Sequence, residues 1–170
     1  MATTYEPIAT TTLSSTVSTV TFNSIPSTYT DLRLVAVVNA ATGTNIAIGY
    51  NNEAVNSNTN YSSTDIEANG SAVGSYRYTN RGPGAAYLTN NYTAGVSGIP
   101  WLCTFDIFSY ASTSVYKTYL ASLAADTNGS GVDIQQVCLY RNTNAITAIT
   151  LYATNMVAGS TLTLYGIKAA

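Results

Sequence analysis

The chain has 170 residues, a formal net charge of −2 and only 8% charged residues, with 46% hydrophobic ones. This length fits one domain, which can bury a core without metal or disulfide staples. Its six Lys and Arg residues are scattered, so no basic stripe is present to bind phosphates, and nucleic acid is not an expected partner.

The N-terminal residues 1–15 lack the basic stretch and the roughly 7–15-residue apolar core of a signal peptide. No apolar run approaches the ~18 residues that a membrane-spanning helix needs. We therefore expect a chain that is made in a cytoplasm and has no membrane partner.

Alternation of apolar and polar residues, the period of a half-buried strand, recurs along most of the chain. In the segment 31–38, for example, it places Leu32, Leu34, Ala36 and Val38 on one face. In chain order, strands are predicted at 5–13, 17–22, 31–38, 45–50, 75–79, 85–89, 101–110, 115–123, 132–140, 145–153 and 160–168.

Three segments depart from this simple pattern. Within 132–140, the pair Gln135-Gln136 shifts the apolar residues from even-numbered to odd-numbered positions, which predicts a β-bulge. The segment 114–126 allows a short helix as an alternative to a strand. Residues 51–84 are polar and show no sustained period, which indicates a long insertion that extends to about residue 91. Insertions of this kind often carry function or contact a partner.

Many short strands separated by turn clusters predict an antiparallel β-sandwich with jelly-roll-like connections. We expect one such domain over residues 1–170, with the polar insertion at about 51–91. Cys103 and Cys138 each lie in a strand pattern, so we expect buried, unpaired thiols, with a bridge between neighbouring strands as the alternative.

The residue types limit the chemistry. The chain has no histidine, which removes Ser-His-Asp and Cys-His catalysis and His-based zinc sites. No glycine-rich phosphate loop is present. A glycosidase needs only two facing carboxylates, so Asp65, Glu67, Asp106 and Asp133 remain formal candidates. Because Asp65 and Glu67 lie in the polar stretch, solvated side chains are expected there. We predict no enzyme activity, no cofactor and no metal.

The segment 126–131 has Asp126, Asn128 and Ser130 at alternate positions before a glycine, as in the first half of a calcium-binding EF-hand loop. However, Val137 occupies the twelfth position, where a bidentate Glu is required. Asn128-Gly129 is itself a strong hairpin turn. A turn is therefore the favoured interpretation, with a weak calcium site as the alternative.

Fourteen tyrosines are the stronger functional signal. Tyr and Arg are enriched at protein interfaces, and several of both gather in the polar middle of the chain. The alternative is that many of these rings are half-buried strand residues. The candidate interface residues are Tyr61, Tyr76, Arg77, Tyr78, Arg81, Tyr87 and Tyr92.

Both ends of the chain carry short, spaced sequence motifs. The start has the patterns I-A-x-x-x-L at 8–13, V-x-F-x-S-I-P at 20–26 and Y-T-D-L at 29–32. The end has I-T-x-I-T-L at 146–151 and M-V-x-G-S-x-x-x-L-Y-G-I at 156–167. With these motifs the chain resembles a broad group of tailed-phage virion proteins over residues 1–35 and 146–168. The matching segments are framework strands that carry no functional site.

The resemblance implies a β-sandwich subunit of a virion, made in the cytoplasm of a bacterial host and displayed on the virion surface. We expect a capsid decoration (cement) protein that binds the major capsid protein. We also expect it to form a homo-oligomer, with a trimer as the favoured state. The alternative is a receptor- or glycan-binding module associated with the tail or a fibre.

Overall fold

The computed structural model describes residues 4–40, 46–53, 59–82, 98–126 and 128–168. These residues form eleven strands: β1 (Tyr5–Thr12), β2 (Val17–Phe22), β3 (Asp31–Val38), β4 (Ile46–Tyr50), β5 (Tyr61–Ala68), β6 (Val73–Arg81), β7 (Trp101–Phe108), β8 (Lys117–Ala125), β9 (Val132–Tyr140), β10 (Ile149–Met156) and β11 (Thr161–Ile167). The predicted strand at 85–89 lies outside the described residues.

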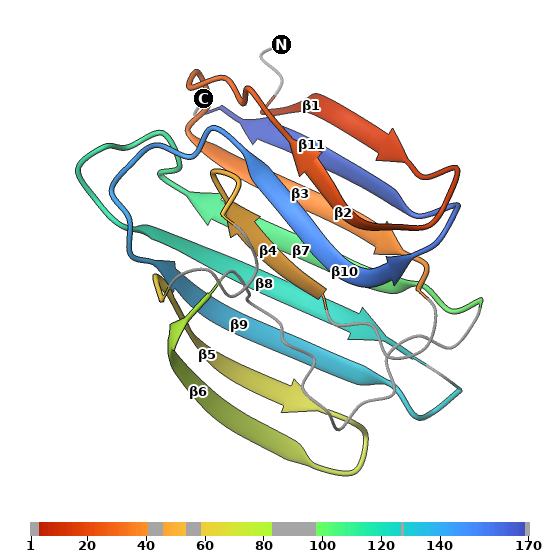
Figure 1. The fold of residues 1–170 in the computed structure, drawn as a ribbon. Helices are drawn as coiled ribbons and strands as arrows, with labels where there is room; N and C mark the ends of the chain where they lie inside the picture. Colours follow the sequence, from red (N-terminus) through yellow and green to blue (C-terminus); the bar gives the residue numbers. More distant parts are fainter. Residues whose placement is uncertain (1–3, 41–45, 54–58, 83–97, 127, 169–170) are drawn as a thin grey trace.

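The strands form two antiparallel sheets that pack face to face (Figure 1). The large sheet has eight strands in the order β1-β11-β3-β7-β8-β9-β5-β6, and the small sheet has three in the order β2-β10-β4. The predicted all-β sandwich is confirmed. Its jelly-roll-like connectivity stays a prediction.

The core lies between the sheets, and in the large sheet it follows from alternation along the strands. In β3 the residues at even-numbered positions, Leu32 to Val38, are buried, and those between them are partly exposed. On the small sheet, Ile48 and Leu151 are fully buried and belong to the same hydrophobic cluster. Alternation with one face inward is what two-layer packing requires.

The two closing strands belong to different sheets. β10 is the central strand of the small sheet, whereas β11 lies between β1 and β3 in the large sheet. The chain crosses between the layers at the turn before β11, where Ser160 is fully buried. Its hydroxyl accepts a hydrogen bond from the Asn39 backbone N–H at 3.0 Å and donates to the Val157 carbonyl at 2.8 Å. β1 pairs with β11, so the first and last strands lie side by side in the framework.

Lys117 is hydrogen-bonded to two loops at one end of the sandwich. It is fully buried at the start of β8, and its Nζ donates to the carbonyl oxygens of Ser112 (2.6 Å), Val115 (3.0 Å) and Thr143 (2.7 Å). Burial lowers the pKa of this ammonium group. The helix considered for 114–126 is wrong, because residues 117–125 form a strand paired with β7 and β9.

The β-bulge expected at Gln135-Gln136 is also wrong. β9 pairs with β8 and with β5 without a register shift, and its buried positions alternate without interruption from Val132 to Tyr140. The inward positions in its second half are held by Gln136 and Cys138, both buried. The strand is regular, but the polar residue Gln136 at an inward position interrupts the apolar period in the sequence.

The polar stretch expected to be an irregular insertion contains two strands of the large sheet. β5 pairs with β9 and forms a hairpin with β6, which is the last strand of the sheet (Figure 1). Asn69 closes the hairpin, since its Oδ1 accepts from the backbone N–H groups of Ser71 and Ala72. The period of β5 was hidden because two of its inward residues are Asp65 and Glu67.

Candidate interaction surfaces

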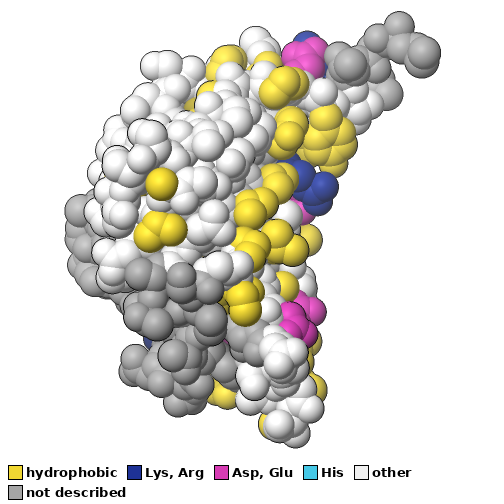
Figure 2. All heavy atoms as spheres, turned by 90° about the vertical axis from the view of Figure 1, so that its right-hand side faces the viewer, with side chains coloured by type: hydrophobic (Ala, Val, Ile, Leu, Met, Phe, Trp, Pro, Cys, Tyr) yellow, Lys and Arg dark blue, Asp and Glu magenta, His cyan; other side chains and the backbone are white. Residues whose placement is uncertain are grey.

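The outer face of the large sheet, on the side away from the small sheet, is unusually apolar. A solvated face normally alternates polar residues outward. Here large hydrophobic side chains stand outward on five neighbouring strands, each at least 39% exposed: Ile66, Val73, Leu102, Phe108, Leu120 and Val137. In Figure 2 this side forms the right-hand contour, which is hollowed and carries a band of hydrophobic side chains.

The strand register determines which of these outward side chains lie next to each other. Leu120 lies directly opposite Val137 across the β8–β9 pair, and Asp106 of β7 is the next residue in that row. Residues directly opposite on antiparallel strands have Cβ atoms about 4.5–5.5 Å apart. Leu120 and Val137 therefore pack together in the middle of the face, while polar residues such as Gln135 and Ser122 lie between them and the other outward hydrophobic side chains. Exposed hydrophobic side chains gathered on one face indicate a contact with another molecule.

Arg33 and Asp106 form an ion pair in the middle of this outer face, and their charges neutralise each other. The Arg33 guanidinium donates to both oxygens of Asp106, from Nε at 2.5 Å and from Nη2 at 2.7 Å. The hydrogen bonds to Asp106 are the main cause that raises the pKa of Arg33. The pair is cross-strand neighbours on β3 and β7, and a bidentate geometry of this kind leaves little free charge in the middle of the face.

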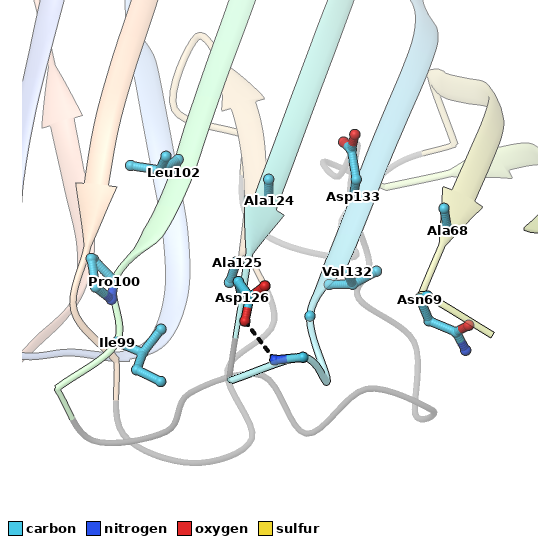
Figure 3. Close-up of a pocket in the computed structure, with 13 residues that line it drawn as sticks. Ala68, Asn69, Ile99, Pro100, Leu102, Ala124, Ala125, Asp126, Val132 and Asp133 are labelled. Atoms are coloured by element: carbon cyan, nitrogen blue, oxygen red, sulfur yellow. Dashed lines mark hydrogen bonds between the residues drawn. The ribbon is translucent and has the colours of Figure 1, made fainter. Parts of the chain in front are cut away.

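A pocket of about 770 Å³ opens at one end of the outer face (Figure 3). Its sheet side is formed by Leu102, Ala124 and Ala68, and small residues in that row leave the space open. Asp133 stands beside them, and the hairpin loops after β5 and β8 form the rim. The pocket is suited to an apolar side chain from a neighbouring molecule.

The segment resembling half of an EF-hand is a hairpin turn in that rim, as favoured from the sequence. Asn128 and Gly129 have φ values of 61° and 86°, the left-handed region that this dipeptide accepts readily. Asp126 Oδ1 accepts a hydrogen bond from the Gly129 backbone N–H at 2.8 Å, drawn as a dashed line in Figure 3. The Asp126 carboxylate thus stabilises the turn.

The candidate interface residues of β6 do not share one face. Tyr76 and Tyr78 point to the same side as the core-facing residues of β5, whereas Arg77 lies on the outer face opposite Thr64. The two rings are stacked, with centroids 6.5 Å apart and an interplanar angle of 16°. The Arg81 guanidinium lies 3.7 Å from the Tyr78 ring centroid, so ring, ring and cation form one ladder along the sheet edge.

Glycine makes room for this ladder. A Cβ atom on Gly74 would come within 2.7 Å of the Tyr76 ring, so the ring lies over the backbone of its own strand. Tyr76 is 41% exposed and presents an aromatic surface at the last strand of the sheet. Tyr87 and Tyr92, the other candidates near this region, lie outside the described residues.

Tyr61 is a core residue, which corrects its assignment as an interface candidate. It is buried and packs against the Tyr50 and Tyr140 rings, with centroids 6.0 Å and 4.8 Å away. Its hydroxyl donates to Glu53 Oε2 at 2.7 Å, and the Tyr140 hydroxyl donates to Glu53 Oε1 at 2.8 Å. Burial is the largest cause that raises the pKa of both phenols. One carboxylate thus satisfies two buried hydroxyls.

Asp65 and Glu67 are buried, which corrects the expectation that they are solvated. They are 1% and 3% exposed and lie two residues apart on the inward face of β5. Burial is the main cause that raises the pKa of each carboxyl group. Asp106 and Asp133 stand on the opposite, outer face, so these four residues do not form one catalytic pair across a cleft.

Cys103 and Cys138 are both buried and unpaired, as expected. Burial raises the pKa of each thiol, so neither is a nucleophile at neutral pH. In the part of the chain that the structure describes, no group of three or more His, Cys, Asp and Glu side chains could hold a metal ion. The same residues include no helix long and apolar enough to cross a membrane.

No protein-family model matches the chain, and neither a curated protein nor a solved structure matches it.

Proposed function

We propose that this chain is a structural subunit of a tailed-phage virion, a capsid decoration protein that binds its neighbours through the outer face of the large sheet. The apolar, hollowed character of that face is the observation that carries the proposal. A free monomer gains nothing from exposing such a patch, whereas a subunit that is always bound buries it. The framework strands at the two ends supply the resemblance to virion proteins.

The low charge of the chain supports the same function. A lattice of fixed neighbours removes the need for a strongly charged, repelling surface. On the outer face, Arg33 and Asp106 already neutralise each other, so little uncompensated charge must be desolvated when the middle of the face is covered. The partner is the major capsid protein, and the subunit assembles as a trimer. The proposal contains no catalytic step.

Charge insertion into the outer face tests this function. Leu120→Glu combined with Val137→Glu places two carboxylates directly opposite each other on exposed positions of the patch. Their mutual repulsion lowers stability by about 1 kcal/mol or less, and no buried residue is changed. An unpaired charge that must be desolvated costs about 2–3 kcal/mol or more, equal to a ~30–150-fold loss of affinity. We expect the variant to fold and to be missing from purified particles.

The matched control is Thr19→Glu, on an exposed position of β2 in the small sheet, which should leave incorporation unchanged. Location of the wild-type subunit on the head, by cryo-electron microscopy of whole particles, completes the test. Full occupancy of the double variant on capsids would show that the outer face is not the binding surface.

The aromatic ladder favours a second function, a glycan-binding module of the tail. Exposed parallel rings such as Tyr76 can stack on sugar rings, and Arg81 can donate to hydroxyl groups. Tyr76→Ala with Tyr78→Ala removes the ladder, and Arg77→Ala on the other face is the control. Particles that carry the ladder variant at full copy number but fail in host adsorption would favour this second function.

A further inference from the structure

Three polar side chains lie together on the inward face of β5 and β9. Asp65, Glu67 and Gln136 are 1%, 3% and 5% exposed, although the chain contains only eight Asp and Glu residues. Asp65 is directly opposite Gln136 across the β5–β9 pair, and Glu67 follows two residues along the same face. Figure 1 shows β9, β5 and β6 as adjacent strands at one end of the large sheet.

Two oxygen atoms in this group have no hydrogen-bond partner. They are Asp65 Oδ1 and Gln136 Oε1, each fully removed from solvent. Buried acceptors are nearly always satisfied in native proteins, by protein groups, ordered water or an ion. Both atoms belong to side chains that face each other, so a single bound species can satisfy the pair.

The burial of two carboxyl groups side by side favours a positively charged occupant. Asp65 and Glu67 are 1% and 3% exposed and lie two residues apart on the same face of β5, and buried negative charge is costly unless a cation or hydrogen bonds compensate it. Arg81 and the side-chain hydrogen bonds from Ser63 and Gln136 act on Asp65. They leave one of its oxygens without a hydrogen-bond partner.

We propose that Asp65, Glu67 and Gln136 bind a calcium ion. Cβ atoms of directly opposed residues are about 4.5–5.5 Å apart, and residues i and i+2 on one strand are ~7 Å apart. Those spacings let two carboxylates and one amide oxygen converge on a common centre. Calcium takes 6–8 oxygen ligands at roughly 2.3–2.6 Å in irregular geometry, and water completes the shell.

The donor set selects against other metals. All three side chains offer oxygen, which suits hard cations, whereas zinc prefers thiolate and imidazole. Cys138 is the nearest thiol on the inward face of β9, and burial keeps it protonated. Magnesium requires near-ideal octahedral geometry and gives up its water reluctantly, which an amide and two strand-borne carboxylates do not provide. The assignment departs from the expectation of no metal drawn from the sequence.

Calcium titration of chelator-treated protein tests the site without reference to the virion. At one hundred times the dissociation constant, ligand binding should raise Tm by about 5–10 °C for a chain of this length. Magnesium should produce a much smaller shift. Terbium, which substitutes for calcium, should show luminescence on tyrosine excitation, because Tyr76 lies directly opposite Asp65 on β6.

Variants separate binding from stability. Asp65→Asn and Glu67→Gln each remove one buried negative charge, so the calcium-free protein should be as stable as wild type or more stable. Both variants should lose the calcium-dependent Tm shift and the terbium signal. Gln136→Leu removes a neutral ligand and should weaken both. The control is Asp133→Asn, on the outer face of β9, which should behave as wild type.

Three results would overturn the proposal. The first is wild-type protein that shows neither a calcium-dependent Tm shift nor terbium luminescence. The second is a Tm shift that persists unchanged in Asp65→Asn and Glu67→Gln, which would place the ion elsewhere. Equal stabilisation by magnesium would remove the calcium assignment. Loss of particle binding in the outer-face variants would leave all three readouts unchanged, so this site and the proposed virion function are tested separately.

Discussion

Replacement of Lys117 by methionine should destabilise the protein more than any exposed lysine substitution. Lys117 is fully buried, and its ammonium group donates to three carbonyl oxygens within 3.0 Å, with a fourth at 3.4 Å, all from two loops. A hydrogen bond to a charged group contributes about 1.5–3 kcal/mol, and a buried acceptor left without a partner costs a similar amount. Methionine matches the aliphatic stem in length and offers no donor.

The magnitude follows from those opposing effects. The four bonds share one ammonium group, so their contributions do not add, and methionine recovers part of the burial energy. We expect a net loss of about 3 kcal/mol in the free energy of unfolding. For a domain of this size, that corresponds to a fall in Tm of about 6–12 °C.

Thermal unfolding monitored by near-ultraviolet circular dichroism measures the effect. Lys168→Met is the control, because Lys168 is exposed and its Nζ makes an ion pair with Glu6 at 2.7 Å and lies 5.6 Å from the Tyr29 ring centroid, both weak contacts at an exposed site. It should shift Tm little. An unchanged or higher Tm for Lys117→Met would refute the reasoning, since it would mean that desolvation of the buried ammonium cancels its hydrogen bonds.

Two further predictions concern glycine and tyrosine. Gly166→Ala should lower the free energy of unfolding by about 1–3 kcal/mol, because the added Cβ would clash with the Tyr29 ring. Gly74→Ala should lower it less, because the half-exposed Tyr76 ring can rotate away from the added Cβ. Chemical denaturation of both variants measures the difference. Burial raises the pKa of several core tyrosines, so their stabilising contribution is complete below pH ~10 and is lost as pH rises through the folded-state pKa. Absorbance at alkaline pH should therefore show the buried phenols ionising only together with cooperative unfolding; ionisation of these phenols while the fold remains intact would contradict this. These buried residues are Tyr50, Tyr61, Tyr119 and Tyr140.

Much of the framework was predictable because inward positions there are apolar. The period of two along β3 grouped Leu32, Leu34, Ala36 and Val38 on one face, and the structure buries all four. The all-β class, the strands near both ends and the buried cysteines follow from the same alternation. The partition into eight and three strands was not predictable, since it depends on which strands pair across long sequence separations.

The interaction surfaces were only partly predictable. Tyrosine enrichment directed attention to Tyr76 and Tyr78, which lie on the last strand of the sheet, but composition cannot tell a core ring such as Tyr61 from an edge ring. The hydrophobic residues of the outer face lie at the alternate positions of the same strands, between the residues that point into the core. Leu102, Leu120 and Val137 alternate with buried residues, and a strand that is apolar in both registers signals a sheet with two covered faces.

Two errors of sequence interpretation meet at one place in the molecule. The false bulge arose at Gln136, and the false irregular insertion hid Asp65 and Glu67; these residues face each other across the β5–β9 pair. Both errors have one cause, because a polar side chain at an inward position breaks the pattern that identifies a strand. The other buried polar residues outside this group, Lys117, Thr150 and Ser160, all have hydrogen-bond partners, whereas Asp65 and Gln136 each keep one buried oxygen without a partner. A buried polar group without a partner costs stability. The coincidence of Asp65 with Gln136, each with an unpartnered oxygen, is therefore an argument for a bound cation that is independent of the electrostatics of the group.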